Sequence, residues 1–258
     1  MKKPAHGGRY VFGVNPVLEA LRARPEEVEH LYLAEGQLAP GQAAEVLSRA
    51  RDAGVRVHRV ARERLHAMAE GGVHQGLVAE VREYAYADVG ELLTSARASG
   101  RPALIVVLDG IQDPQNLGAI IRSAHAFGAH GVVVPKDRAA GMSGAVAKAS
   151  AGAVEHCRVA RVVNLSRALE ELKEKGLWTV AAVPGASQPL WQAPLDGPLA
   201  IVVGAEGTGV RPGVLGHCDL QVSIPMEGQV GSLNASVSAG VLLYEAARQR
   251  LTWRSRLS

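Results

Sequence analysis

The sequence predicts an α/β protein in two parts: a small α/β domain, followed by a domain built on a parallel sheet. From residue 104 onwards, short apolar runs alternate with amphipathic stretches of helical period, the pattern of a parallel sheet with crossover helices. The chain has 47% hydrophobic residues but only 4% aromatic residues, together with 29 glycines. This composition fits an aliphatic core and excludes a disordered chain. A break at 99–102, Ser-Gly-Arg-Pro, separates the two parts.

Residues 1–85 form the predicted first domain, which contains short strands and short helices. Asn15 is expected to cap a helix that Pro16 begins. Strands are predicted at 11–13, 30–33, 55–60 and 77–81, and further helices at 42–53 and 62–68. Arginines recur at 49, 51, 56, 59, 62 and 64 against Asp52 and Glu63. They are either a solvated face or a surface that contacts RNA, and the same alternatives hold for the glycine-rich loop 71–76.

Residues 86–100 form a predicted linker with a helix at 88–98, and residues 101–258 form the second domain. The run at 104–108 is continuously apolar, as expected for a strand buried on both faces. Further strands are predicted at 132–134, 154–159, 178–183, 199–203 and 220–224, and helices at 116–127, 143–150, 165–175 and 234–249. Strands and helices that alternate in this way favour a parallel sheet.

Three glycine-containing loops follow the ends of predicted strands in the second domain. They contain Asn116 to Arg122, Gly204 to Gly209, and Ser232 to Asn234. Glycine allows the backbone to approach a ligand closely, and a helix N-terminus offers unpaired N–H groups. None of these loops has the G-x-G-x-x-G of dinucleotide-binding folds or the lysine of a P-loop. From spacing alone, each is either an ordinary strand–helix joint or part of a ligand site.

Together the three loops resemble the motifs N-x-G-x-x-x-R, G-x-E-x-x-G and S-L-N-x-S of the SpoU (TrmH) family of RNA ribose 2′-O-methyltransferases. The similarity covers 104–250, and 10–76 is similar to an RNA-binding domain found on one branch of that family. The resemblance implies a deep trefoil knot in the second domain, S-adenosylmethionine as cofactor and a homodimer through the knotted domain. It also implies methylation of a guanosine in 23S rRNA. The alternatives are a ribose methyltransferase for tRNA or another rRNA site, and a non-enzymatic RNA-binding assembly factor.

The same resemblance implies the site residues. Arg122 matches the family arginine proposed to activate the ribose hydroxyl; because guanidinium hardly deprotonates, a clamp on phosphate that stabilises a developing alkoxide is the safer physical role. Asn116 is expected to cap its helix and position ribose, and Glu206 to orient Arg122 or Asn116. The remaining candidates are Ser232 and Asn234 for the substrate or the loop, and, for the cofactor, Val203, Gly204, Gly207, Ile224, Met226 and Leu233.

No metal site is expected, because transfer from a sulfonium needs no metal. Asp109 and Asp113 are interpreted as turn residues. Cys157 and Cys218 each follow a histidine, but neighbouring residues point apart on a strand, which disfavours a shared metal site. Two cysteines suit a reducing cytoplasm. There is no apolar run of 18 residues and no signal-peptide pattern at 1–8, so neither a membrane span nor export is expected.

Overall fold

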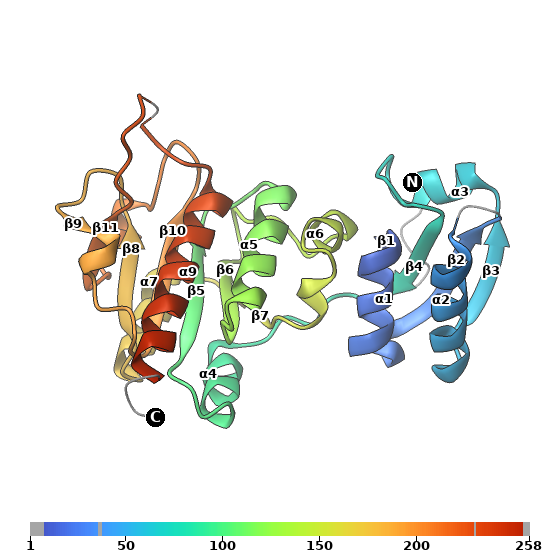
Figure 1. The fold of residues 1–258 in the computed structure, drawn as a ribbon, viewed down its shortest axis with the longest axis horizontal. Coiled ribbons are helices and arrows are strands. Elements are labelled where there is room, and N and C mark those ends of the chain that lie inside the picture. The colour runs from blue at the N-terminus through green and yellow to red at the C-terminus, as the bar shows by residue number, and fades with distance from the viewer. Residues whose placement is uncertain (1–7, 36–37, 230, 255–258) are drawn as a thin grey trace. The chain divides into compact units, whose positions relative to one another are not determined.

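The computed structural model describes residues 8–35, 38–229 and 231–254. The chain divides into two compact units (Figure 1). The first unit comprises Met1–Ala85 together with Gly141–His156, and the second comprises Tyr86–Ala140 together with Cys157–Ser258. The chain therefore passes between the units three times.

The first unit is built on a four-stranded mixed sheet in the order β1-β4-β2-β3. β4 (Leu77–Val81) runs antiparallel to β1 (Arg9–Phe12) and β2 (Val28–Ala34), whereas β3 (Arg56–Val60) is parallel to β2 and forms an edge. The other elements are α1 (Val14–Ala23), the 3-10 turn η1 (Pro25–Glu27), α2 (Pro40–Asp52) and α3 (Arg62–Met68). These agree with the predicted elements to within a few residues.

The start of α1 differs from the prediction. Gly13 occupies the N-cap position, with φ 95, and has no side chain with which to cap the helix. Asn15 lies inside the helix and is exposed, so the prediction that it caps α1 was wrong. The first N–H of the helix instead donates to Gln75 Oε1, 3.3 Å away in the loop before β4. Gln75, a residue distant in sequence, therefore accepts the hydrogen bond that Asn15 was expected to accept.

The segment Gly141–His156 carries α6 (Gly144–Ala149) and the 3-10 turn η2 (Ala153–Glu155), and it packs with the first unit. The strand predicted at 154–159 was wrong, because the chain turns at Gly152 with φ 88 and the next strand begins only at Val159. Glu155 points into the first unit, where Arg9 donates to it at 2.7 Å. Both side chains are buried, so this ion pair fixes the segment to β1.

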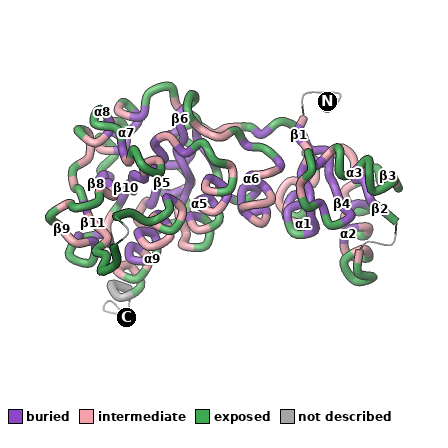
Figure 2. Tube along the Cα trace, turned by 90° about the horizontal axis from the view of Figure 1, so that it is seen from above, coloured by how far each residue is buried: buried purple, intermediate pink, exposed green. Residues whose placement is uncertain are grey.

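The second unit is built on a seven-stranded parallel sheet in the order β7-β6-β5-β10-β8-β11-β9. Its strands are β5 (Leu104–Asp109), β6 (Gly131–Pro135), β7 (Val159–Val162), β8 (Trp178–Ala182), β9 (Gln188–Pro189), β10 (Leu199–Gly204) and β11 (Leu220–Ser223). Every residue of β5 and β6 is buried, as expected for a sheet covered on both faces. Figure 2 shows these buried strands in purple. The predicted parallel α/β architecture is confirmed.

The helices of the second unit are α4 (Val89–Ala98), α5 (Pro114–Ala126), α7 (Leu165–Glu174), α8 (Pro212–Leu215) and α9 (Ala235–Arg254), with the 3-10 turn η3 (Leu190–Gln192). A reciprocal capping box between Asp88 and Glu91 begins α4. α5 and α9 lie side by side (Figure 1), so the first and third sequence motifs, which begin these helices, come together. Among the described residues, no helix is both long and apolar enough to cross a membrane.

Candidate active site

The three motif loops follow the carboxyl ends of β5, β10 and β11 in the parallel sheet. β10 pairs with β5 in parallel, and Gly204 at the end of β10 lies opposite Asp109 at the end of β5. The loop after β5 leads into α5, and the loop after β10 carries Glu206. In open parallel sheets, ligands bind outside these carboxyl ends, so the topology itself places the motifs where a site is expected.

One side chain from each motif joins a hydrogen-bonded cluster. Asn116 Nδ2 donates to Glu206 Oε1 at 3.1 Å, and Asn234 Nδ2 donates to Asn116 Oδ1 at 2.9 Å. Asn234 Nδ2 also donates to the same Glu206 oxygen, which further accepts from the backbone N–H of Ala235 at 3.4 Å. We refer to Asn116, Glu206 and Asn234 as the motif cluster. The carboxylate links the starts of α5 and α9, because hydrogen bonds to an ionised acceptor are the stronger kind.

The caps of α5 and α9 explain why the two asparagines reach each other. Asp113, and not Asn116, caps α5, since its carboxylate accepts from the N–H groups of Gln115 and Asn116 at 3.1 and 3.2 Å. The predicted capping role of Asn116 was therefore wrong. Asn234 Oδ1 accepts from the N–H groups of Ser236 and Val237 at 2.9 and 3.3 Å, as an N-cap does. Its amide nitrogen is left to join the motif cluster.

Asp109 is not a turn residue, contrary to the prediction. It ends β5 with 1% exposure. Its carboxylate accepts two hydrogen bonds from Arg211, from the backbone N–H at 2.8 Å and from Nε at 2.7 Å, and forms an ion pair with Nη2 at 2.6 Å. The hydrogen bond to Asp109 raises the pKa of the Arg211 guanidinium. The pair ties the end of the Gly204–Arg211 loop to the sheet, because a buried carboxylate needs such partners.

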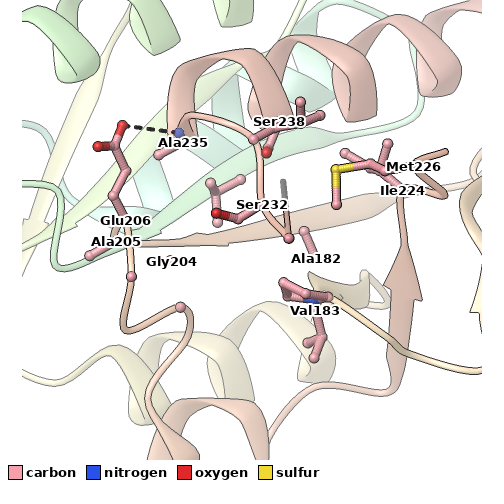
Figure 3. Close-up of a pocket in the computed structure, with 16 residues that line it drawn as sticks. Ala182, Val183, Gly204, Ala205, Glu206, Ile224, Met226, Ser232, Ala235 and Ser238 are labelled. Carbon is pink, nitrogen blue, oxygen red and sulfur yellow. Dashed lines mark hydrogen bonds between the residues drawn. The ribbon is translucent and has the colours of Figure 1, made fainter. Parts of the chain in front are cut away.

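A pocket of about 340 Å³ opens beside the motif cluster (Figure 3). In Figure 3, Glu206 and Ala205 lie at one side, Ile224 and Met226 at the other, and Ser232 between them. All six predicted cofactor residues line it, as do Glu206 and Ser232. Asn116, Asn234 and Arg122 are not among its lining residues. The pocket thus unites the second and third motifs, and the motif cluster links it to the first.

Sequence reasoning missed several lining residues, above all Ala182, Val183 and Pro184. Ala182 ends β8, and Val183 and Pro184 follow it; β8 lies beside β10 in the sheet. No local motif marks them, and only the strand order brings them to the site. The other additional lining residues, such as Gly209, Ala235 and Ser238, stand within or next to the motifs.

The pocket suits a ligand with a flat ring and an apolar body. Its walls combine aliphatic side chains with glycine-rich backbone that offers N–H and C=O groups. Gly204 packs directly against the backbone of Gly209 and Val210, and a Cβ there would collide with both. The volume of the pocket falls in the usual range of about 300–1,000 Å³ for small-molecule sites. These features fit S-adenosylmethionine.

Residues 103–244 match the SpoU rRNA methylase family, and residues 10–87 match a family described as the substrate-binding domain of RNA 2′-O ribose methyltransferases. The chain belongs to the SpoU family. It is 44% identical to a Bacillus subtilis protein named putative TrmH family tRNA/rRNA methyltransferase YacO, over 93% of this chain and 96% of that one. It is also 44% identical to the 23S rRNA (guanosine-2′-O-)-methyltransferase RlmB of Pseudomonas syringae pv. tomato, over 93% and 95% of the two chains.

Solved SpoU structures share the fold. The SpoU methyltransferase AviRb of Streptomyces viridochromogenes has a TM-score of 0.79 and 28% identity, covering 95% of this chain and 91% of that one. A second AviRb structure, in complex with AdoMet, has a TM-score of 0.78 and 27% identity, over 95% and 92% of the two chains. This SpoU protein is accordingly an RNA ribose 2′-O-methyltransferase that uses S-adenosylmethionine. When bound, that cofactor supplies an electrophilic methyl group on a sulfonium.

Arg122 stands apart from the motif cluster in this SpoU enzyme. It lies in the C-terminal half of α5, not at the start of the helix, and its side chain is exposed. Among the described residues, the hydrogen bonds of Glu206 go to Asn116, Asn234 and Ala235, and none reaches Arg122. Of the two partners predicted for Glu206, the structure therefore shows Asn116. Arg122 presents its guanidinium to solvent, where a substrate phosphate has access.

Among the described residues, no group of three or more histidine, cysteine, aspartate or glutamate side chains could hold a metal ion. Asp113 is occupied as a helix cap and Asp109 by Arg211. Cys157 is buried, and burial raises the pKa of its thiol to about 12. Burial likewise raises the pKa of the Cys218 thiol, to about 11. Neither thiol is set up as a thiolate nucleophile or ligand at neutral pH.

Proposed function

We propose that this enzyme methylates the ribose 2′-hydroxyl of a guanosine in 23S rRNA, in the cytoplasm. The observation that carries the site is the motif cluster of Asn116, Glu206 and Asn234 beside a glycine-lined pocket. The target is supported by 44% identity, over most of both chains, to a protein named for that reaction. Domain organisation supports it as well, since residues 10–87 match a substrate-binding family.

We assign the site residues as follows. Val203, Gly204, Gly207, Ile224, Met226 and Leu233 hold the cofactor, since all line the pocket. Asn116 and Glu206 position the ribose, and Asn234 holds the motif cluster together while capping α9. Ser232 lines the pocket and contacts the substrate. Arg122 clamps the target phosphate and stabilises the alkoxide that develops as the hydroxyl loses its proton.

The test is methylation of defined RNAs by the purified enzyme with radiolabelled cofactor, followed by mapping of the modified ribose. A single modified guanosine in a 23S rRNA transcript is the expected result. The name of the Bacillus subtilis relative covers tRNA as well as rRNA, so tRNA is assayed in parallel. Methylation confined to tRNA would refute the proposed target but not the chemistry. If the protein bound the cofactor but methylated no RNA, including total RNA from a deletion strain, the result would favour a non-enzymatic assembly factor.

We assign RNA binding to the first unit and cofactor binding to the second. The first domain in this division is residues 1–85, the linker is 86–100 and the methyltransferase domain is 101–258. All pocket residues lie in the second unit, which supports this assignment. The segment 141–156 belongs to the first unit, so a truncated chain that begins near Arg101 would leave that segment without its packing partners. Point substitutions are therefore a cleaner test than truncation.

We further propose that the enzyme is a homodimer through the knotted domain that the family resemblance implies. Val237, Tyr244 and Leu251 recur every seven residues on α9 with exposed fractions of 50%, 58% and 66%. Residues at this spacing share one helix face, and an exposed apolar stripe is characteristic of an interface. Tyr244→Arg is expected to shift the dimer to monomer in light scattering at low micromolar concentration. A monomeric wild type would refute the proposal.

A further inference from the structure

One face of the sheet in the first unit carries polar and aromatic side chains where aliphatic ones are usual. Side chains alternate between the two faces of a strand, so the register defines which residues share a face. Tyr10 and His30 both pair with Glu80, His30 pairs with Arg56, and Tyr32 pairs with His58. Tyr10, Glu80, His30 and Arg56 therefore form one row across all four strands, and Tyr32 and His58 lie in the next row on the same face.

Helix α3 covers only part of this face. Leu65 of α3 and Ala69, which follows the helix, pack with Phe12, Tyr32 and Val78 in one apolar cluster. Tyr10 is half-buried and packs against that cluster, whereas His30 is half-buried and Arg56 and His58 are exposed. We refer to Tyr10, His30, Arg56 and His58 as the open row. Because the row contains no aliphatic side chain, covering it with a further element of the fold is not needed for stability.

The rings of the open row are held in place by the protein itself. The His58 ring stacks on that of Tyr32, with ring centroids 5.2 Å apart and an angle of 21° between the planes. His30 meets His58 edge-on, with a ring nitrogen of each 3.3 Å apart. Tyr32 in turn donates its hydroxyl to the buried carboxylate of Glu80 at 2.8 Å. The exposed His58 ring is therefore already held in one orientation at the sheet edge. A partner that stacks on it has little entropy of ordering to overcome.

Unpaired positive charge surrounds this ring. Arg56, Arg62 and Arg64 are exposed, and no ion pair involves any of them in the part of the chain that the structure describes. The guanidinium of Arg64 lies 5.7 Å from the Tyr32 ring centroid. By contrast, Arg22 and Arg49 on the nearby helices share Glu45. Arginines without acidic partners can bind the phosphates of a polyanion, and the exposed ring beside them can stack on its bases.

We propose that the open row binds an unpaired nucleobase of the RNA, stacked on His58, with Arg56 and Arg64 on the adjoining phosphates. The inference rests on the proposed function in that the enzyme acts on RNA. Aromatic rings on a sheet face recognise splayed-out single-stranded bases, because every base has a stacking face. A base inside a helix has no free face to offer, so the partner is a loop, bulge or end of the RNA.

The test uses the full-length enzyme and a fluorescein-labelled, unstructured ten-nucleotide RNA, titrated by fluorescence anisotropy over a series of salt concentrations. His58→Ala is expected to weaken binding by ~10-fold or more, the scale of losing one stacked base. His58→Phe should restore most of the affinity. Arg56→Ala should lower the slope of log affinity against log salt by about one, the loss of one phosphate contact, whereas His58→Ala should leave that slope unchanged. The matched control, His217→Ala, alters a histidine of the second unit and should bind as wild type does.

Three results would overturn the inference: wild-type affinity for His58→Ala, a phenylalanine variant as weak as the alanine one, or photocrosslinks from 5-iodouridine RNA that avoid the peptide containing His58. The crosslink uses the wild-type protein, so it decides the matter even if a variant unfolds. Failure of the proposed function looks different: the wild-type enzyme would bind the RNA, with the base at His58, yet methylate no RNA.

Discussion

The two sheets of this protein keep their polar groups in different places. In the seven-stranded sheet, the central strands β5 and β10 are apolar and buried in their interiors, and the proposed site residues lie at or beyond strand ends such as those at Asp109, Gly204 and Ser223. In the four-stranded sheet, polar and aromatic side chains occupy one face itself, at Tyr10, His30 and His58. In the assignments proposed above, one sheet presents an edge to its ligand, whereas the other presents a surface.

The difference follows from how each sheet is covered. Parallel strands are joined by crossover connections that are usually helices, and these helices bury both faces of the sheet. Only the ends of its strands remain accessible, which favours a compact pocket for a small molecule. The mixed sheet has antiparallel neighbours and a short helix over one part of a face, so an extended polymer has access to the rest. Four predictions sharpen or break this division, in order of expected effect.

The largest effect is expected at Arg122. Arg122→Ala should lower the single-turnover methyl-transfer rate by ~100-fold or more, the scale of losing one transition-state donor. Stability and cofactor affinity should change little, because the side chain is exposed and lines no part of the pocket. Arg122→Lys should recover little, since lysine lacks the planar fork. Arg167→Ala, at an exposed site on α7, is the control. A fully active lysine variant would show that the role is wrong.

The Asp109–Arg211 pair should show an asymmetry in stability. Arg211→Ala leaves a buried carboxylate without its guanidinium and should cost about 2 kcal/mol in the free energy of unfolding, somewhat less than for a fully buried pair because the backbone N–H remains. Asp109→Ala should cost less, because the Arg211 side chain is 44% exposed and can return to water. Denaturant titration measures both. Equal losses in the two variants would contradict the argument.

Within the motif cluster, the expected effect is on rate and on coupling. Glu206→Ala should slow methyl transfer by ~10-fold, since it acts by orienting its neighbours. Glu206→Ala with Asn116→Ala should be scarcely worse than the poorer single variant, because the two share one hydrogen bond. Glu206→Ala with Arg122→Ala should instead be nearly additive, since no such bond joins them. Coupling in the second pair and none in the first would reverse the assignment.

The smallest effect is expected from one buried histidine in each unit. Burial lowers the pKa of His74 and of His130. Each accepts a backbone N–H at Nδ1, from Gly76 at 3.1 Å and from Leu104 at 3.0 Å. The folded chain therefore takes up protons at these histidines at a lower pH than the unfolded chain, in which histidine titrates near pH 6.5. Stability should therefore be lost on acidification, by at most about 1.4 kcal/mol per pH unit for each histidine.

Unfolding of His130→Asn and His74→Asn at pH 7.5 and pH 5.5 measures these losses. Each variant should be less stable than wild type at pH 7.5 but should lose less stability on acidification. If a variant lost as much stability on acidification as the wild type, the substituted histidine would not contribute to the pH dependence of stability.

Most elements could be predicted because their signals are local. Apolar periodicity located β5 and β10, and the three motifs marked both helices that bound the site. Asp109 could not be assigned from sequence, because its partner Arg211 lies 102 positions away. Ala182 to Pro184 could not be predicted for the same reason, because they reach the pocket only through the position of β8 next to β10. Asn15 and Asn116 have cap-forming side chains, but Gly13 and Asp113 stand at the positions where the helices begin.

The segment Gly141–His156 also determines when the first unit can be completed during synthesis. Arg9 and its buried partner Glu155 are 146 positions apart, so a ribosome must release more than half of the chain before β1 acquires this ion pair. Until then the buried face of β1 that receives Gly144 is open to solvent. Loop closure over such a distance is slow relative to local helix formation. We therefore expect the amino-terminal sheet, although made first, to gain its final protection against proteases only after β5 and β6 have been synthesised.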